Sequence, residues 1–241
     1  QAARWRAAAP RLTPLAWLEA GAALLVLLLY SQALLGKLFA PEGGGEAPVL
    51  RLIWPPVYLL TLILIAGRPA RVLSVAMRAW PILLLVGLAG ASTLWSIDPE
   101  ITARRALAIA MNTAFALWLA ARFSWGDIAR MVAAAFAVLA AGSVLAAVLA
   151  PGFGVMQSIH PGAWSGLWFE KNSLGGMMAL GALAAAAASA SAPQHERTAW
   201  RLVAALCLVL VALSTSRTAM MAAVIGVGGT VMIAIARRGV A

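Results

Sequence analysis

Residues 131–150 read MVAAAFAVLAAGSVLAAVLA, a run of 20 positions without a charged side chain. A helix of this length rises about 30 Å, at about 1.5 Å per residue, which matches the hydrocarbon thickness of a bilayer. The run is apolar on every side, whereas a helix on the surface of a soluble domain is apolar along one stripe. It therefore predicts a transmembrane helix.

Similar apolar runs recur along the whole chain. Of its 241 residues, 63% are hydrophobic and 11% are charged, whereas an ordinary soluble domain has about 25% charged residues. We expect an all-α fold, a polytopic transmembrane helix bundle that forms a single domain over residues 1–241. Its eight helices are predicted at about 15–39, 49–66, 80–97, 101–121, 128–150, 173–190, 199–213 and 217–236.

The positive net charge of +10 has two possible meanings. In a soluble protein it would indicate nucleic-acid binding, but here the basic residues lie between apolar runs, where they set membrane topology. The lipid bilayer, and not nucleic acid, is therefore the predicted partner. With a cytoplasmic N-terminus, most basic residues fall on the inside, which favours a multi-pass protein of that orientation. These are Arg4, Arg6, Arg11, Arg68, Arg71, Arg78, Arg122, Arg130, Arg197, Arg201, Arg237 and Arg238.

The remaining basic residues are predicted on the outside. They are Lys37, Arg51, Arg104, Arg105, Lys171 and Arg217. All but Lys37 lie in or beside a predicted helix N-terminus, which already carries partial positive charge and free backbone N–H groups. Cations are unfavourable there unless an anion binds, so we predict one pocket near the outer leaflet for a phosphate-bearing ligand. The alternative is that these side chains extend to ordinary lipid headgroups.

Two short segments carry the strongest signals for such a pocket. Residues 169–176 (FEKNSLGG) are expected to start a helix, with Asn172 or Ser173 as its cap. The paired glycines expose backbone where a ligand or another helix can approach. Residues 214–217 (STSR) join two apolar runs with almost no loop, which holds Arg217 near headgroup depth. A cation at that depth is a functional candidate.

Other features have structural explanations. Asp98 is placed to cap the helix 101–121, and Glu19 is expected to reach water at the cytoplasmic end of the first helix. The segment 151–172 is expected to form a packed or interfacial loop, in which His160 is more simply a solvated side chain than a general base. The sequence has a single cysteine and no Cys/His cluster with metal-ligand spacing, so no metal site is predicted.

The strings GLWFEKNSLGGMMAL (166–180) and LSTSRTAMMA (213–222) resemble the O-antigen ligase and polymerase superfamily, and are most similar to its exopolysaccharide-production members. The segment LWSIDPEITARRAL (94–107) resembles an earlier external loop and helix of that family. The resemblance covers about residues 85–236 and implies the fold of type C membrane glycosyltransferases.

The resemblance also implies an activity. Such proteins are metal-independent enzymes, without cofactors, that act in the bacterial inner membrane. They transfer a glycan from undecaprenyl pyrophosphate to an acceptor glycan or lipid on the periplasmic side, as ligases or polymerases in cell-envelope polysaccharide biosynthesis. Arg217 would stabilise the pyrophosphate, Lys171 and Asn172 would bind nearby, and Arg104 or Arg105 would assist.

Family members have a large periplasmic loop after these helices, with an Arg and a His that activate the acceptor. The sequence ends before such a loop, so we expect a C-terminal continuation and give His160 no inherited role. A polytopic transporter or lipid-linked glycan flippase is the alternative function, because short helices interrupted by Gly and Pro are typical of transporters. The absence of an internal repeat favours the transferase.

Overall fold

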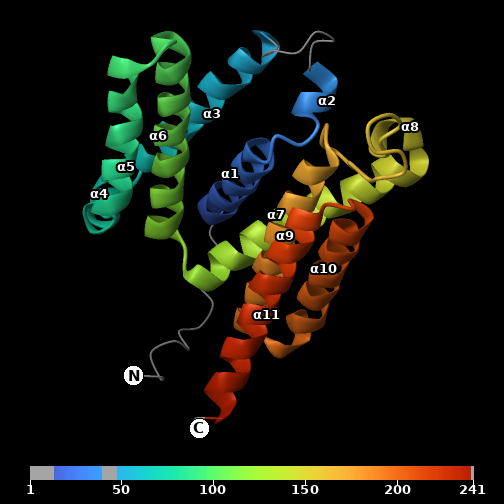
Figure 1. Cartoon of the computed structure of the whole chain (residues 1–241). Coiled ribbons are helices and arrows are strands. Elements are labelled where there is room, and N and C mark those ends of the chain that lie inside the picture. Colours follow the sequence, from blue (N-terminus) through green and yellow to red (C-terminus); the bar gives the residue numbers. More distant parts are fainter. Residues whose placement is uncertain (1–13, 40–47, 240–241) are drawn as a thin grey trace.

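A computed structural model describes residues 14–39 and 48–239, and the side chains of residues 14–39, 51–230 and 232 (Figure 1). Every regular secondary-structure element in these ranges is a helix, so the predicted all-α class is confirmed for the described part of the chain. In chain order they are α1 (Pro14–Tyr30), α2 (Leu35–Phe39), α3 (Pro48–Ala66), α4 (Pro69–Arg78), α5 (Trp80–Ala91), the 3-10 helix η2 (Ser92–Trp95), α6 (Pro99–Arg122), α7 (Trp125–Leu149), α8 (Pro151–Gly154), α9 (Lys171–Ser191), α10 (Gln194–Leu213) and α11 (Arg217–Gly239).

Two of the described helices, α7 and α9, are long and apolar enough to cross a membrane. The number rises to three if α3 and α4, which meet at a bend of 99°, form one broken span. By length and composition the structure thus supports two or three of the eight predicted crossings. The helix α1 and the segment Trp80–Trp95 are apolar but shorter.

The first predicted helix, 15–39, is interrupted in the structure. The helix α1 ends at Tyr30, and Gln32 and Leu34 adopt φ angles of 54° and 66°, in the left-handed region. The hydroxyl of Ser31 donates to the carbonyl of Leu28 at 2.6 Å, which gives the chain a local alternative to the next helical turn. The mostly apolar run 15–39 therefore does not form one continuous helix.

The helix α4 was not predicted. It begins with Pro69 directly after Arg68, because proline suits the first helical position. It is amphipathic, with Val72 buried and with Arg71 and Arg78 exposed. A short helix of this kind, at a sharp angle to its neighbour, has the composition of an interfacial segment.

The turns between helices gather at two ends of the molecule. In Figure 1 the α5–α6 turn and α2 lie at the upper end, whereas the α6–α7 and α9–α10 turns lie at the lower end. Glu19 of α1 accepts hydrogen bonds from Arg68, at 3.2 Å, and from Arg122. The Glu19 side chain is only 12% exposed, so the expectation that it simply reaches water is wrong. It instead ties α1 to the α3–α4 turn and to the end of α6.

Glu19→Gln is expected to destabilise the protein by about 1–3 kcal/mol, because two partly buried arginines lose their charged partner. Thermal unfolding in a neutral detergent measures the change. Glu100→Gln is the control, since the Glu100 side chain is 83% exposed and lies 3.9 Å from Arg104. An exposed pair of this kind contributes at most about 1 kcal/mol. Equal losses for both variants would show that the Glu19 ion pairs do not hold these helices together.

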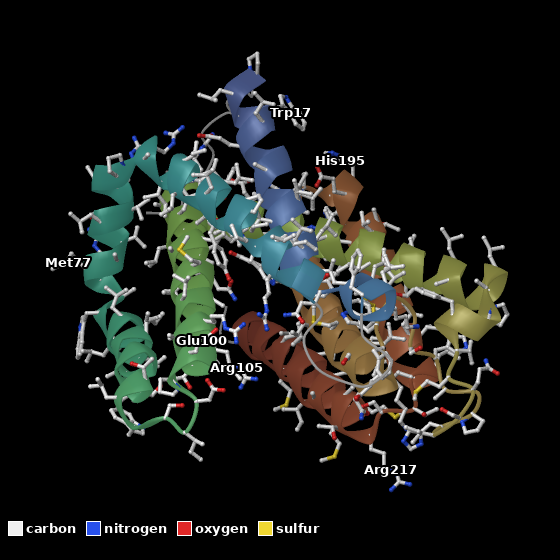
Figure 2. All side chains as sticks on the ribbon, turned by 90° about the horizontal axis from the view of Figure 1, so that it is seen from above. Trp17, Met77, Glu100, Arg105, His195 and Arg217 are labelled. Carbon is white, nitrogen blue, oxygen red and sulfur yellow. The ribbon has the colours of Figure 1, made fainter. Side chains whose placement is uncertain are left out.

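Apolar side chains also cover much of the outside of the bundle. Figure 2 shows Trp17 and Met77 projecting away from the helices, and these residues are 65% and 68% exposed. Many leucines on α3, α5 and α6 are similarly exposed. Soluble monomers rarely expose apolar patches beyond a few hundred Å², so this surface is typical of one that contacts lipid or a partner.

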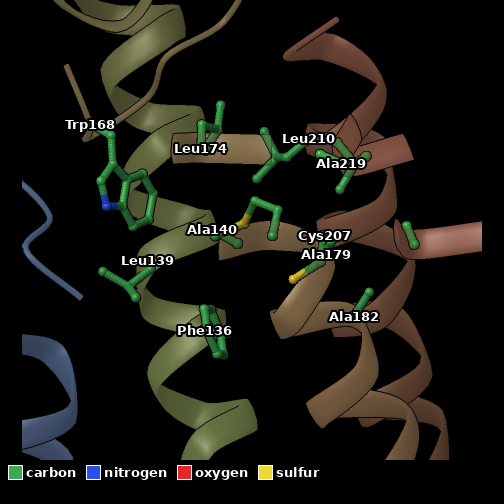
Figure 3. Packing of buried hydrophobic residues seen from close by; sticks show 13 residues of the cluster. Phe136, Leu139, Ala140, Trp168, Leu174, Ala179, Ala182, Cys207, Leu210 and Ala219 are labelled. Carbon is green, nitrogen blue, oxygen red and sulfur yellow. The ribbon is translucent and has the colours of Figure 1, made fainter. Parts of the chain in front are cut away.

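One buried hydrophobic cluster joins α7, α9, α10 and α11 (Figure 3). A second joins α1, α3, α4 and α6. In the first, Phe136, Leu174, Cys207 and Leu210 pack among the alanines of α9. Gly181 is required, because a Cβ at this position would lie 2.9 Å from Phe136 Cγ and 3.0 Å from Cys207 Sγ. Small residues let these helices approach closely, and this packing holds the N-terminal ends of α9 and α11 in position.

Candidate anion-binding site

The first residues of α9 and α11 meet at one cavity of about 580 Å³. Lys171 is the first residue of α9 and Arg217 is the first residue of α11. We call this space the α9/α11 cavity. Among the described residues, those that line it are His160, Lys171, Asn172, Thr215, Arg217 and Thr218, and none of these is acidic. The structure thus brings together three of the predicted site residues: Lys171, Asn172 and Arg217.

The helix α9 starts two residues before the predicted position. Glu170 occupies the N-cap position and its side chain makes no capping hydrogen bond, so the prediction that Asn172 or Ser173 caps the helix is wrong. The Glu170 carbonyl accepts from the backbone N–H of Leu174 at 3.2 Å. Asn172 therefore lies in the first turn, where its side chain lines the cavity. Backbone N–H groups of this turn lack intrahelical partners and can bind an anion.

The helix α11 follows α10 after a turn of only three residues, 214–216. The Ser214 hydroxyl donates to the Val211 carbonyl at 2.7 Å and accepts from the Ser216 backbone N–H at 3.3 Å. The Ser216 carbonyl accepts from the N–H of Met220 at 3.0 Å, as expected of the residue that precedes a helix. Both serines are buried, so the turn is fixed against the core and sets the position of Arg217.

Thr215 is the strained residue of this turn. Its φ angle is 52°, in the left-handed region that β-branched residues rarely adopt. Its hydroxyl oxygen lies 3.3 Å from Lys171 Nζ, which donates a hydrogen bond to it. The strain thus accompanies a direct link between the start of α9 and the α10–α11 turn, and strained residues of this kind cluster at functional sites.

Thr215→Asn is expected to raise the free energy of unfolding by about 1 kcal/mol, because asparagine tolerates the left-handed conformation better than threonine does. Thermal unfolding in detergent measures the effect. Thr218→Asn is the matched control. Thr218 lies in the first turn of α11, and threonine and asparagine have similar helix propensities. A destabilised Thr215→Asn variant would show that the threonine conformation is not strained.

A close contact between α9 and the turn holds the two helix starts together. A Cβ added to Gly175 would lie 2.6 Å from Ser214 Oγ and 2.9 Å from the Ala219 side chain. A Cβ added to Gly176 would meet nothing within 4 Å. Of the two glycines singled out in the sequence, Gly175 therefore permits the approach of another helix, and Gly176 faces open space.

The segment 151–172 was predicted to be a packed or interfacial loop. Its first residues form α8, and residues 155–170 form a loop in which Ala163, Ser165 and Trp168 are buried. Lys37 donates to the carbonyls of Phe153 and Gly166 and to the Ser165 hydroxyl. The Trp168 indole N–H donates to the Ser31 carbonyl at 2.9 Å. Lys37 therefore anchors α2 to the loop and does not line the α9/α11 cavity.

Arg104 and Arg105 lie elsewhere. Together with Arg51 they line a second cavity of about 850 Å³, which we call the α3/α6 cavity. The expected single pocket is therefore divided in two. The reason is packing, because α6 contacts α3, α4 and α5, whereas α9 contacts α7, α10 and α11. Figure 2 shows Arg105 and Arg217 on different parts of the molecule.

The start of α6 follows the expected capping. The carboxylate of Asp98 accepts from the Ile101 N–H at 3.0 Å, and Pro99 occupies the first helical position. This chemistry accounts for Asp98 without a ligand.

Three further residues line the α9/α11 cavity: His160, which was expected to be a solvated side chain, and Thr215 and Thr218, which were not named as candidates. The loop that contains His160 and the residue Arg217 were both expected on the outer side of the membrane. That shared side was the signal in the sequence that could have placed His160 near Arg217. A neutral imidazole can accept a proton and a protonated one can bind an anion. Within 14–39 and 48–239, no group of three or more His, Cys, Asp or Glu side chains could hold a metal ion.

No protein-family model, curated protein or solved structure matches this chain. The functional interpretation therefore depends on the two cavities, their charges and the sequence strings that resemble the O-antigen ligase superfamily.

Proposed function

We propose that this chain is the membrane-embedded part of a glycosyltransferase that transfers a polyprenyl-pyrophosphate-linked glycan to an acceptor outside the cytoplasm, as an O-antigen ligase or an exopolysaccharide or O-antigen polymerase. One observation carries the proposal: two helix N-termini and two cations, Lys171 and Arg217, share a cavity with no acidic side chain among its described lining residues. A pyrophosphate is the doubly charged group that such a cavity suits.

The proposed membrane arrangement has eight crossings, with the N-terminus in the cytoplasm of the bacterial inner membrane. The apolar outer surface and the two or three helices of sufficient length and hydropathy support it. The contacts are consistent with the predicted sides of the membrane. Arg68 and Arg122, both expected on the cytoplasmic side, form ion pairs with Glu19. Lys171 and Arg217, both expected on the outer side, line one cavity. The basic residues Arg4, Arg6 and Arg11, on which the orientation partly depends, lie outside the described residues.

The chemistry follows from charge. An acceptor hydroxyl attacks the anomeric carbon, a C–O bond to the acceptor forms, and the C–O bond to the pyrophosphate breaks. Negative charge grows on the departing pyrophosphate as that bond breaks. Arg217, Lys171 and the first N–H groups of α9 and α11 are arranged to stabilise this charge electrostatically. Arginine suits the role because its planar guanidinium binds phosphate oxygens through two parallel hydrogen bonds.

The proton of the acceptor hydroxyl requires a base. His160 lies on the same cavity, 11 residues before Lys171 in the chain, and its imidazole can take this role.

Membrane vesicles that contain the protein test the function. They are given a fluorescent glycan on polyprenyl pyrophosphate together with an acceptor glycan or lipid. We expect the label to move to the acceptor and free polyprenyl pyrophosphate to accumulate, with or without a metal chelator. A transporter or flippase would instead move the intact lipid-linked glycan across the bilayer and leave the C–O bond between the glycan and the pyrophosphate unbroken. That second result would overturn the proposal.

A further inference from the structure

The helix α4 lies apart from both cavities, and its ten residues form three different faces. Residues three or four apart share one face of a helix. The least exposed face consists of Val72, Val75 and Ala76, and α4 contacts α6. Val72 is buried in the cluster that contains Trp118 and Leu119 of α6. This packing fixes the rotation of α4 about its own axis, so the other two faces point away from α6.

These two outer faces differ in chemistry. One is apolar, because Leu73 and Met77 lie four residues apart and are both exposed. Figure 2 shows Met77 projecting away from the helices. The other face is polar and consists of the exposed residues Arg71, Ser74 and Arg78. A helix with an apolar face and a basic face is typical of a segment that lies in the plane of the membrane–water interface.

The angle between α3 and α4 agrees with that position. The 19 residues of α3 extend about 29 Å, at about 1.5 Å per residue, so α3 can cross the hydrocarbon core without α4. At a bend of 99° to such a crossing, α4 runs close to the membrane plane. As the second half of one broken span, α4 would instead carry Arg71 and Arg78 into hydrocarbon, which is unfavourable. Trp80 follows α4 directly and is exposed, as is common for tryptophan at the interface.

The basic residues around α4 have two different roles. Arg68 occupies the N-cap position, and its guanidinium lies 3.2 Å from the Glu19 carboxylate, which ties the start of α4 to α1. Within the described part of the chain, neither Arg71 nor Arg78 forms an ion pair. Arg68 therefore holds α4 in place, whereas Arg71 and Arg78 present their charge to the surroundings.

We propose that α4 lies in the membrane surface and binds anionic phospholipid headgroups through Arg71 and Arg78, while Leu73 and Met77 insert between the acyl chains. Guanidinium groups pair with lipid phosphates, and an anionic surface attracts each basic residue near it. The apolar face of α4 continues the exposed apolar surface of α3 and α5, the helices on either side of it in the chain, which favours lipid as the occupant. The inference depends on the protein being membrane-embedded, and it is independent of glycan transfer.

Spin labels on the full chain, in vesicles of phosphatidylcholine and phosphatidylglycerol in equal amounts, test the depth of α4. One label is attached to Leu73→Cys and, in a separate sample, to Ser74→Cys. Oxygen concentrates among acyl chains, whereas a nickel chelate stays in water. We expect oxygen to reach the label of Leu73→Cys more often and the chelate to reach that of Ser74→Cys, because neighbouring residues point about 100° apart on a helix. Cys207, the single cysteine of the sequence, is buried, so the chain without an added cysteine measures background labelling.

A second measurement tests the preference for anionic lipid. A fluorophore on Met77→Cys is quenched by bromine on the acyl chains of either phosphatidylglycerol or phosphatidylcholine, with identical chains. We expect phosphatidylglycerol to be preferred at least about tenfold at this position, since each of two arginines contributes about fivefold. The double variant Arg71→Gln, Arg78→Gln should lose this preference. The double variant Arg105→Gln, Arg201→Gln, which removes the same charge at exposed sites on other helices, should keep it.

Four results would overturn the proposal. Oxygen at both labels would place α4 inside the bilayer as half of a broken span, and the nickel chelate at both would place it in water. Labels that neither reagent reaches would show that protein covers this face. Equal quenching by the two lipids, or the same preference in both double variants, would show that Arg71 and Arg78 do not select anionic headgroups. Should the variant of these two arginines fail to fold, judged by its thermal transition, the two labels and the comparison of lipids with both arginines present decide.

Discussion

Gly175→Ala is expected to lower the free energy of unfolding by about 1–3 kcal/mol and to separate the start of α9 from the α10–α11 turn. The added methyl group would lie 2.6 Å from the buried Ser214 hydroxyl and 3.0 Å from the Ser216 Cβ. Neither serine can move easily, because the hydrogen bonds of the Ser214 hydroxyl fix the turn. The helix start must therefore shift, and Lys171 moves with it.

Gly176→Ala is the control for that result, one position along the same helix. Its Cβ would meet nothing within 4 Å, so the substitution should leave stability unchanged or raise it by up to about 1 kcal/mol through the helix propensity of alanine. Thermal unfolding of both variants in one detergent gives the comparison. Two variants of equal stability would contradict the close contact between α9 and the turn.

Arg217→Lys is expected to reduce glycan transfer by about 10-fold to 100-fold, and Arg217→Ala by about 100-fold to 1,000-fold, as for removal of one donor that stabilises transition-state charge. Lysine keeps the charge but cannot bind two phosphate oxygens through parallel hydrogen bonds. Because Arg217 is exposed at the first position of α11, neither change should disturb the core.

The transfer assay in vesicles measures this loss, together with the amount of protein in the membrane fraction. Arg201→Ala is the matched control, because Arg201 is also exposed but lies on α10 away from the cavity residues. It should retain full transfer. Normal transfer by Arg217→Ala at normal protein levels would remove this arginine from the proposed reaction.

Much of the helical structure could be predicted from the apolar runs. The run 131–150 lies in α7 apart from its last residue, and the runs 101–121 and 217–236 correspond to α6 and α11 within a few residues. Apolarity over 20 residues is a strong signal of this kind. It could not reveal the break after Tyr30, which depends on left-handed residues and a serine hydroxyl, or the short amphipathic helix α4.

The candidate site was predictable in part for a different reason. Lys171 and Arg217 each lie at a helix start, and a helix start can be recognised locally from its residues. Which starts share one cavity depends on packing between segments far apart in the chain. Gly175 decides it for α9 and α11, whereas Arg104 and Arg105 follow α6 to its contacts with α3. All five candidate residues, Arg104, Arg105, Lys171, Asn172 and Arg217, could be named from the sequence. Their division between two cavities could not be predicted from it.

The central claim is that the α9/α11 cavity binds pyrophosphate, and the affinity of the purified chain for a short-chain prenyl pyrophosphate measures it most directly. In isothermal titration, the double variant Lys171→Gln, Arg217→Gln should bind the prenyl pyrophosphate at least about 100-fold more weakly than the unchanged protein, because it lacks two charge-assisted contacts. The matched double variant Arg104→Gln, Arg105→Gln should bind like the unchanged protein, since its residues line the other cavity. Equal affinity in all three proteins, or a loss confined to the Arg104 and Arg105 variant, would contradict the account.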